Sequence, residues 1–111
     1  MAWQEKQLFQ SRINGTSLTS VYSPPDNTTT IVKHVTICNT TAVADTFELC
    51  IDDDGTTYSA ATALYWDVSI AGNTTLELDV FWAMNNTNGN IAFRNATANS
   101  LTITGFGVEI T

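Results

Sequence analysis

Apolar residues of this chain alternate with polar residues over several short stretches, and this period of two restricts the fold more than any other feature. Successive side chains of a β-strand point to opposite faces of a sheet, so the alternation predicts strands with one buried face. The breaks between the stretches are rich in Asn, Asp, Gly and Pro, which favour turns. The predicted strands are Ser17–Ser23, Ile31–Cys38, Thr46–Ile51, Leu64–Ile70, Thr74–Trp82, Asn90–Asn95 and Ser100–Ile110.

Within each predicted strand, the apolar positions indicate the face that packs on the core. The last strand is irregular, because its apolar residues before Gly105 fall on odd positions, whereas Phe106 and Val108 fall on even ones. One extra residue would bring both sets to the same face, so we expect a β-bulge at Gly105 or Gly107. For two strands the alternation predicts shared faces: Ile31, Val35 and Ile37 with Lys33, and Phe47, Leu49 and Ile51. For the other strands, the predicted inward residues are Leu64, Trp66, Val68 and Ile70; Leu76, Leu78, Val80 and Trp82; and Ile91 and Phe93.

Length and composition favour one all-β domain. The chain has 111 residues, which suits a single hydrophobic core. Its polar residues include 19 Thr, which favours strands, and 10 Asn, which favours turns. We therefore expect a single antiparallel β-sandwich or jelly-roll-like domain over residues 14–111. Residues 1–13 are expected to form a short N-terminal arm or a first strand, and a short helix over Ala2–Ile13 is a further alternative.

The charge of the chain excludes several classes of partner. Eleven Asp and Glu residues against four Lys and Arg residues give a formal net charge of −7. Binding to nucleic acid requires clustered cations that neutralise phosphates, and an anionic membrane surface attracts basic segments, so we expect neither partner. No apolar run approaches the roughly 20 residues that span a bilayer. Met1–Gln10 also lacks the apolar segment of a secretory signal.

No motif of the sequence points to catalysis, to a metal or to a cofactor. His34 is the single histidine and has no spacing to other ligands that a metal site would use. Asp52–Gly55 is a contiguous acidic run without the alternating acidic positions and the later Glu of an EF-hand loop, so we interpret it as a hairpin turn. We expect no catalytic residue, no metal site and no cofactor.

The two cysteines, Cys38 and Cys50, lie in the predicted strands on either side of Asn39–Asp45. If these strands form a hairpin, Cys50 lies opposite His34 and is four residues out of register with Cys38. A disulfide requires Cα atoms within about 7 Å of each other, so we expect two reduced thiols. The same register gathers four side chains on one face: His34, Thr36, Glu48 and Cys50. We interpret this group as a surface or interface cluster rather than as a nucleophile or a metal site.

Seven residues are candidates for contacts with a partner: Trp3, Leu8, Phe9, Lys33, Tyr65, Phe81 and Arg94. Trp3, Leu8 and Phe9 place a large apolar surface near a chain end. They either cap the domain's own core or lie on a neighbouring subunit. The other aromatic residues belong to a class that is enriched at interfaces, with ordinary core packing as the alternative. The two cations either form ion pairs on this acidic body or anchor an acidic partner surface.

The chain resembles small virion proteins of tailed bacteriophages over residues 18–111, with the spacing of the shared segments preserved. It differs from them in the turn Pro25–Thr29 and at Phe81–Met84, before an Asn-rich loop. The segments that carry the resemblance are Val21–Pro24, Thr30–Asn39, Asp45–Leu49, Asp54–Tyr58, Ala63–Trp66, Ile70–Thr74, Leu101–Ile103 and Gly107–Thr111.

This resemblance implies a structural part of a virion rather than an enzyme. The leading hypothesis is a capsid cement or decoration protein that is made in the bacterial cytoplasm and binds the major capsid protein on the outer lattice. There it would stabilise the expanded shell as a homo-oligomer, commonly a trimer at a symmetry axis. The alternative is a tail, baseplate or fibre component that contacts host glycans through loops such as Asn85–Asn90.

Overall fold

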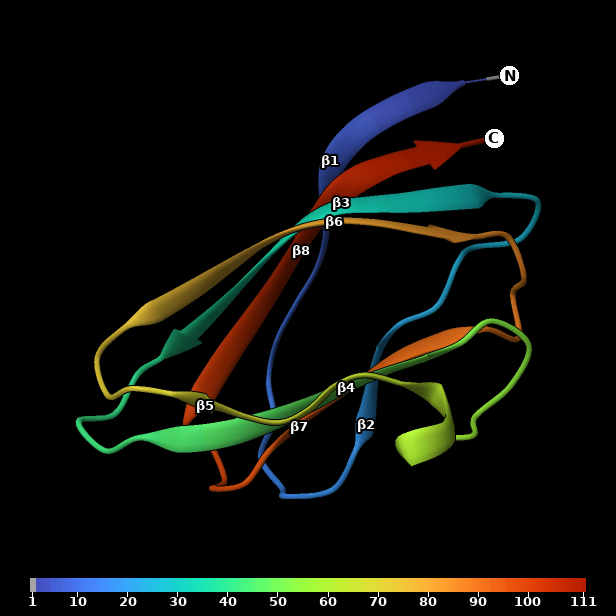
Figure 1. Cartoon of the computed structure of the whole chain (residues 1–111). Helices are drawn as coiled ribbons and strands as arrows, with labels where there is room; N and C mark the ends of the chain where they lie inside the picture. Colours follow the sequence, from blue (N-terminus) through green and yellow to red (C-terminus); the bar gives the residue numbers. More distant parts are fainter. Residues whose placement is uncertain (1) are drawn as a thin grey trace.

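Eight strands form most of residues 2–111, which are the residues that this computed structural model describes (Figure 1). One turn of 3₁₀-helix, η1 (Ala60–Thr62), precedes the fifth strand. Met1, which belongs to the predicted arm, lies outside the described residues. The strands are β1 (Trp3–Arg12), β2 (Thr19–Tyr22), β3 (Thr29–Asn39), β4 (Asp45–Asp52), β5 (Ala63–Ile70), β6 (Thr75–Met84), β7 (Asn90–Asn95) and β8 (Leu101–Ile110).

The strands form two four-stranded antiparallel sheets that pack face to face (Figure 1). Sheet A has the strand order β1-β8-β3-β6, and sheet B has the order β2-β7-β4-β5. With the exception of β4 and β5, consecutive strands lie in different sheets. This is the eight-strand arrangement of a jelly roll, and the predicted all-β sandwich is confirmed.

The core lies between the two sheets and consists of the inward side chains of both. The rings of Phe47 and Phe93 stack at its centre with their centroids 5.9 Å apart. Ile91 and Phe93 are fully buried, as predicted. The predicted alternation of β6 is also confirmed, since its even-numbered apolar residues pack against the core: Leu76, Leu78, Val80 and Trp82.

The predicted hairpin between β3 and β4 is wrong, because the two strands lie in different sheets. The Asn39 side chain holds the connection as an arch: its amide donates to the carbonyl oxygens of Val43 and Ile70, and its oxygen accepts from the Thr41 amide. Both cysteines are free thiols, but the register from which we predicted this does not exist. The four predicted neighbours are separated into two pairs: His34 and Thr36 in sheet A, and Glu48 and Cys50 in sheet B.

The inward face of β5 is only half correctly predicted. Val68 packs against the core, but Leu64 and Trp66 point outward and are 45% and 43% exposed. Tyr65 takes the inward place and packs on Phe47. The pairing with β4 shifts at two places in this segment, and Asp67 has a positive φ of 51°. These β-bulges reverse the face of the first half of the strand.

The predicted bulge in β8 is also wrong. The pairing runs through β8 without an extra residue, and the unpaired residues are Leu8 in β1 and Lys33 in β3. Odd-numbered residues of β8 therefore face the core side along the whole strand. Because Lys33 shifts the phase of β3, Ile31 lies on the outer face, whereas Val32, Val35 and Ile37 are buried in the core. The prediction that Ile31 shares a face with Val35 and Ile37 is therefore wrong.

The connection after Asp52 is longer than the predicted hairpin turn, because η1 intervenes before β5 begins at Ala63. At the other end of the fold, the two termini lie side by side, and Ala2 and Thr111 exchange two backbone hydrogen bonds of 2.9 Å (Figure 1). This end of β1 and β8 curves away from sheet B (Figure 1). None of the helical turns among residues 2–111 has the length and apolar character needed to cross a membrane.

Candidate interaction surface

The outer face of sheet A is apolar at the end that carries the two termini. Across this face the register places Trp3 beside Ile110, and Glu5 beside Val108 and Ile31. Farther along, the pairing aligns Gln7, Phe106 and His34 across the sheet. We use the name "aromatic face" for seven residues of this surface: Trp3, Ile31, Lys33, Phe81, Phe106, Val108 and Ile110.

Three large rings of the aromatic face are in contact with solvent. Phe81 is 71% exposed, Trp3 58% and Phe106 38%. Single exposed apolar residues are common on protein surfaces, but contiguous apolar patches of several hundred Å² mark interaction sites. The three rings lie on three of the four strands of one sheet and on the same side of it, so they form one surface rather than scattered positions.

Side chains of the aromatic face already pack on one another. Val108 has no exposed surface although it does not belong to the sandwich core, so its neighbours on the outer face exclude water from it. The Lys33 ammonium lies 5.9 Å from the centroid of the Trp3 ring. Since β8 lies between the strands of these two residues, their contact spans β8 near Val108. An exposed cation–π contact of this kind contributes about 0.5–1 kcal/mol.

An open depression of about 390 Å³ lies beside this contact. Lys33 and Phe106 form one side of it, and Glu5 and Gln7 of β1 form another. It coincides with the segment in which β1 and β3 each carry an unpaired residue, Leu8 and Lys33. The bulges therefore shape a hollow next to the exposed rings.

Lys33 of the aromatic face takes part in no ion pair within residues 2–111, and neither does Glu5, which lies beside the face. The other three cations are engaged. Lys6 pairs with Glu109 at 2.6 Å, Arg12 donates to the Asn99 carbonyl oxygen at 2.6 and 2.9 Å, and Arg94 pairs with Glu48. Lys33 is thus the cation that this surface can offer to a partner.

His34 marks the polar border of the aromatic face. Its Nδ1 lies 2.8 Å from the Asp79 carboxylate, its Nε2 lies 3.4 Å from Glu77, and its ring packs against Phe106. The hydrogen bond to Asp79 raises the pKa of His34, partial burial opposes this shift, and Glu77 adds to it. Beyond His34 the outer face of sheet A is occupied by polar residues such as Gln10, whose amide donates to the Thr104 hydroxyl.

The opposite side of the same strands is fixed to sheet B by a partly buried polar cluster. The Tyr22 hydroxyl of β2 donates to Glu109 at 2.6 Å and lies 2.7 Å from the Thr30 hydroxyl. Burial, and then the bond to Glu109, raise the pKa of Tyr22 far above its usual value. Burial alone would raise the pKa of Glu109, but the bonds from Lys6 and Tyr22 outweigh it and lower that pKa. The cluster holds the strands beneath the aromatic face.

The structure brings together three of the seven predicted contact residues: Trp3, Lys33 and Phe81. Phe9 lies in the core, and Leu8 is partly buried against it. Tyr65 packs on the core from β5. Four residues of the aromatic face were not among the predicted contacts: Ile31, Phe106, Val108 and Ile110. Phe106, Val108 and Ile110 are marked in the sequence, because the apolar residues of β8 change there from odd to even positions. This change reflects an apolar outer face of the strand and not a bulge.

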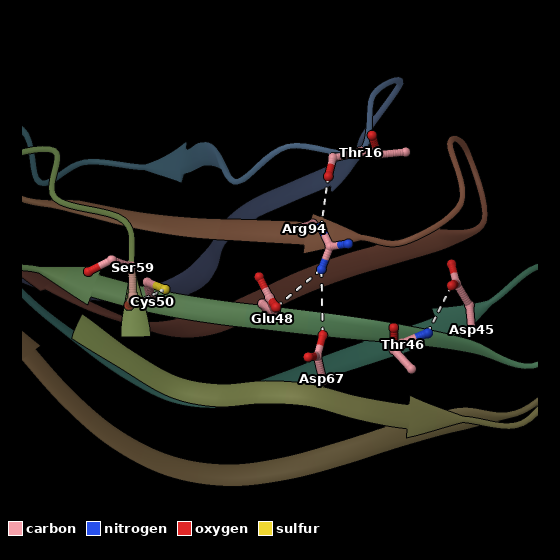
Figure 2. Close-up of polar contacts among 8 residues, drawn as sticks. All are labelled: Thr16, Asp45, Thr46, Glu48, Cys50, Ser59, Asp67 and Arg94. Carbon is pink, nitrogen blue, oxygen red and sulfur yellow. Dashed lines mark hydrogen bonds and ion pairs between the residues drawn. The ribbon is translucent and has the colours of Figure 1, made fainter. Parts of the chain in front are cut away.

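Arg94, the seventh predicted contact residue, lies on the outer face of sheet B and is held by its own chain (Figure 2). Its guanidinium lies 3.2 Å from Glu48 and 3.6 Å from Asp67, and its Nε donates to the Thr16 carbonyl oxygen at 2.8 Å. Burial raises the pKa of Glu48, the neighbouring Asp67 adds to this shift, and Arg94 opposes it. Arg94 thus neutralises the buried Glu48 carboxylate. Its guanidinium is engaged by groups of its own chain and is not offered to a partner protein.

The described residues contain no group of three or more His, Cys, Asp or Glu side chains that could hold a metal ion. Cys50 is the one buried thiol near a carboxylate, and its Sγ faces the Ser59 carbonyl oxygen at 3.5 Å (Figure 2). Burial raises the pKa of Cys50, which disfavours the thiolate that a nucleophile requires. The arrangement is suited to binding by surface burial.

No protein-family model matches the sequence, and no curated protein matches it. Among solved structures, the chain is similar to the coat protein of Tobacco streak virus. A structure of the coat protein dimer gives a TM-score of 0.46 and 10% identity, over 97% of this chain and 81% of that chain. A second structure of the coat protein gives a TM-score of 0.45 and 12% identity, over 99% of this chain and 85% of that chain. We draw no function from these likenesses.

Proposed function

We propose that this protein is a structural component of a virus particle, a capsid cement or decoration protein that binds the major capsid protein on the outer lattice and stabilises the expanded shell. The observation that carries the proposal is the aromatic face, because a chain of net charge −7 keeps three exposed rings and an unpaired Lys33 on one side of one sheet. Binding of this kind involves no catalytic step, metal or cofactor. It needs only surface that becomes buried on assembly.

Two further considerations support a virion role. The sequence resembles small virion proteins of tailed bacteriophages over residues 18–111. Jelly rolls also occur in viral capsid proteins, which is an analogy at the level of the fold. The proposal places the protein on the capsid surface after synthesis in the bacterial cytoplasm, as a homo-oligomer. A trimer at a symmetry axis remains the prediction from the capsid lattice.

A tail, baseplate or fibre component that binds glycans is the second candidate. The observation that favours it is a polar depression of about 390 Å³ between two loops, lined by Asp26, Asn27, Asn85, Asn86 and Thr87. Amides and carboxylates of this kind can exchange hydrogen bonds with sugar hydroxyls. The depression lacks an aromatic ring on which a sugar would stack, so we rank this function second.

Cosedimentation with capsids separates the two candidates. Purified protein is mixed with expanded, undecorated capsids of a tailed bacteriophage and, separately, with capsids that have not expanded. We expect it to sediment with the expanded capsids, to saturate at a fixed number of copies per capsid subunit, and to raise the temperature at which the shells break. A Phe81→Ser variant should bind more weakly, whereas Trp66→Ser, which removes an exposed Trp from sheet B, should bind like the original protein.

Absence of binding to expanded capsids would contradict the cement function. Binding to polysaccharide from the host surface, with a small copy number in purified particles, would favour the tail or fibre function instead.

A further inference from the structure

We propose that the bend between β1 and β2 is a modification site, at which Asn14 deamidates spontaneously to aspartate and isoaspartate. The reaction requires water and no enzyme, and it is fastest where glycine follows asparagine, because a following side chain hinders the approach of the backbone nitrogen. The chain has 10 Asn, and glycine follows two of them, Asn14 and Asn88. The structure leaves the first of these sites open and closes the second. The proposal does not depend on the capsid function, because it concerns the purified protein alone.

The reaction begins when the Gly15 amide nitrogen gives its proton to hydroxide and attacks Cγ of Asn14. The new N–Cγ bond closes a succinimide ring, and the Cγ–Nδ2 bond breaks as ammonia leaves. Water then opens the ring at one of its two carbonyl groups. Opening at Cγ gives aspartate, whereas opening at the main-chain carbonyl leaves the backbone running through Cγ, which is isoaspartate. Either product adds a carboxylate to the bend.

The bend at residues 14–17 leaves the reacting groups accessible, since all four residues are exposed. The Gly15 amide nitrogen donates to no atom of residues 2–111, and beyond its chain neighbours no atom lies within 4 Å of the place of a Cβ on Gly15. The Asn14 side-chain oxygen accepts one exposed hydrogen bond of 3.1 Å from the Asn99 amide. A donor on this oxygen stabilises the charge that develops there during the attack on Cγ.

The second Asn-Gly pair is held in a tight turn. The Gly89 amide nitrogen, which would have to attack, already donates to the Asn86 carbonyl oxygen at 2.9 Å. The Asn88 amide donates to the Asn86 side-chain oxygen at 2.8 Å, and the Asn90 side chain donates to the Asn88 carbonyl oxygen at 3.1 Å. Gly89 is buried, and a Cβ placed on it would lie 2.9 Å from the Asp53 carbonyl oxygen. Attack at this site therefore requires local opening of the turn.

The two products at position 14 should differ in stability. Isoaspartate lengthens the backbone by a methylene group, directly before two carbonyl groups that anchor the bend: the Gly15 oxygen accepts from Asn95 at 2.8 Å, and the Thr16 oxygen accepts from Arg94 at 2.8 Å. The Asn95 side-chain oxygen is buried and has no partner among the described residues, so loss of the bond to Gly15 would leave its whole amide unpaired. Aspartate keeps the backbone length and an oxygen for the bond from Asn99.

Incubation of the purified full chain in warm, mildly alkaline buffer tests the proposal, with peptide mapping by mass spectrometry as the readout. In the folded chain, we expect aspartate and isoaspartate to accumulate at Asn14 at least about tenfold faster than at Asn88, which reacts only after local opening. In guanidinium chloride, which unfolds the turn, the rates at the two positions should agree within about threefold.

Gly15→Ala is the matched variant, because its new Cβ meets no neighbouring atom and the unfolding temperature should not change. It should slow the reaction at Asn14 at least about tenfold, since the methyl group hinders the attacking nitrogen. Among the separated products, the isoaspartate form should unfold at a lower temperature than the aspartate form.

The proposal is overturned if Asn14 stays intact in the folded chain or reacts no faster than Asn88. It is also overturned if the difference between the two sites persists in guanidinium chloride, or if Gly15→Ala reacts at the original rate. Equal unfolding temperatures of the two products would contradict the displacement of the anchoring carbonyl groups.

Discussion

The ring of Phe9 lies directly over Gly105, on the neighbouring strand of sheet A, so closely that a Cβ atom on Gly105 would overlap the ring carbons Cε1 and Cζ. The two residues are cross-strand partners. No glycine among residues 2–111 has a positive φ, so the need for glycine here is steric and not conformational. The bare backbone of Gly105 gives the ring its place at the edge of the core, next to Tyr22.

Gly105→Ala is therefore expected to destabilise the fold by about 1–3 kcal/mol, the usual cost of overpacking. The measurement is the free energy of unfolding from urea titration. Gly15→Ala is the matched control, because no atom lies within 4 Å of its new Cβ, and its effect should stay within about 0.5 kcal/mol. In the double variant Phe9→Leu/Gly105→Ala, the decrease in the free energy of unfolding should be smaller than the sum of the decreases in the two single variants. Strict additivity would show that the contact does not exist.

The single histidine should titrate above its ordinary pKa. The bond to Asp79 raises the pKa of His34, so its protonated form stabilises the fold fully below about pH 6.5, and this contribution is lost as the pH rises through the raised value. The titration is followed by the His34 Cε1 proton signal in NMR spectra. Asp79→Asn should lower the midpoint, and Thr75→Asn, on the same strand, should not. An unchanged midpoint in Asp79→Asn would refute the assignment.

The partly buried cluster beneath the aromatic face gives a pH dependence of stability that is opposite in sign to that of His34. Tyr22→Phe removes a hydrogen bond to the Glu109 carboxylate and should cost about 1.5–3 kcal/mol at neutral pH. Because the pKa of Glu109 is lowered in the fold, the stability gained from its ionised form is present above its ordinary pKa and disappears as the pH falls through the lowered value.

Urea unfolding at neutral and acidic pH measures this dependence. The difference between the original chain and Tyr22→Phe should shrink in acid. Tyr58→Phe, in the connection between β4 and β5, is the control and should have a small effect at both pH values. If the free energy of unfolding lost in Tyr22→Phe does not vary with pH, the Tyr22 hydroxyl of the original chain does not bond to ionised Glu109.

The alternation of apolar residues predicted the strands well where each strand is regular. β6 lies at the edge of sheet A, and its four apolar residues keep one face throughout, although its pairing with β3 shifts between Trp82 and Asp79. In β5 the same reasoning failed at Trp66, because a bulge reverses the face and leaves no mark in the alternation. The pairing of β3 was not predictable either. A hairpin and an arch after Asn39 both satisfy the local pattern, and the actual partners of β3 are distant in sequence.

Part of the candidate site was predictable from residue type. Trp3 is a large apolar side chain near a chain end, Phe81 alternates with the predicted inward residues of its strand, and Lys33 is one of four cations. Phe106 was missed because we assumed that every apolar residue of the last strand faces the core. The outer face of a sheet can also be apolar when it is covered by a partner, and an alternation that changes phase is the sign to look for.

The two thiols should differ sharply in reactivity. Cys50 is fully buried under the segment that contains Ser59, and burial raises its pKa, whereas Cys38 is partly exposed at the end of β3. With an aromatic disulfide reagent under native conditions, one thiol should react at once and the second only at the rate of local opening. Cys38→Ser should abolish the fast phase, and Cys50→Ser should keep it. Equal rates for both thiols in the folded chain would contradict the burial of Cys50.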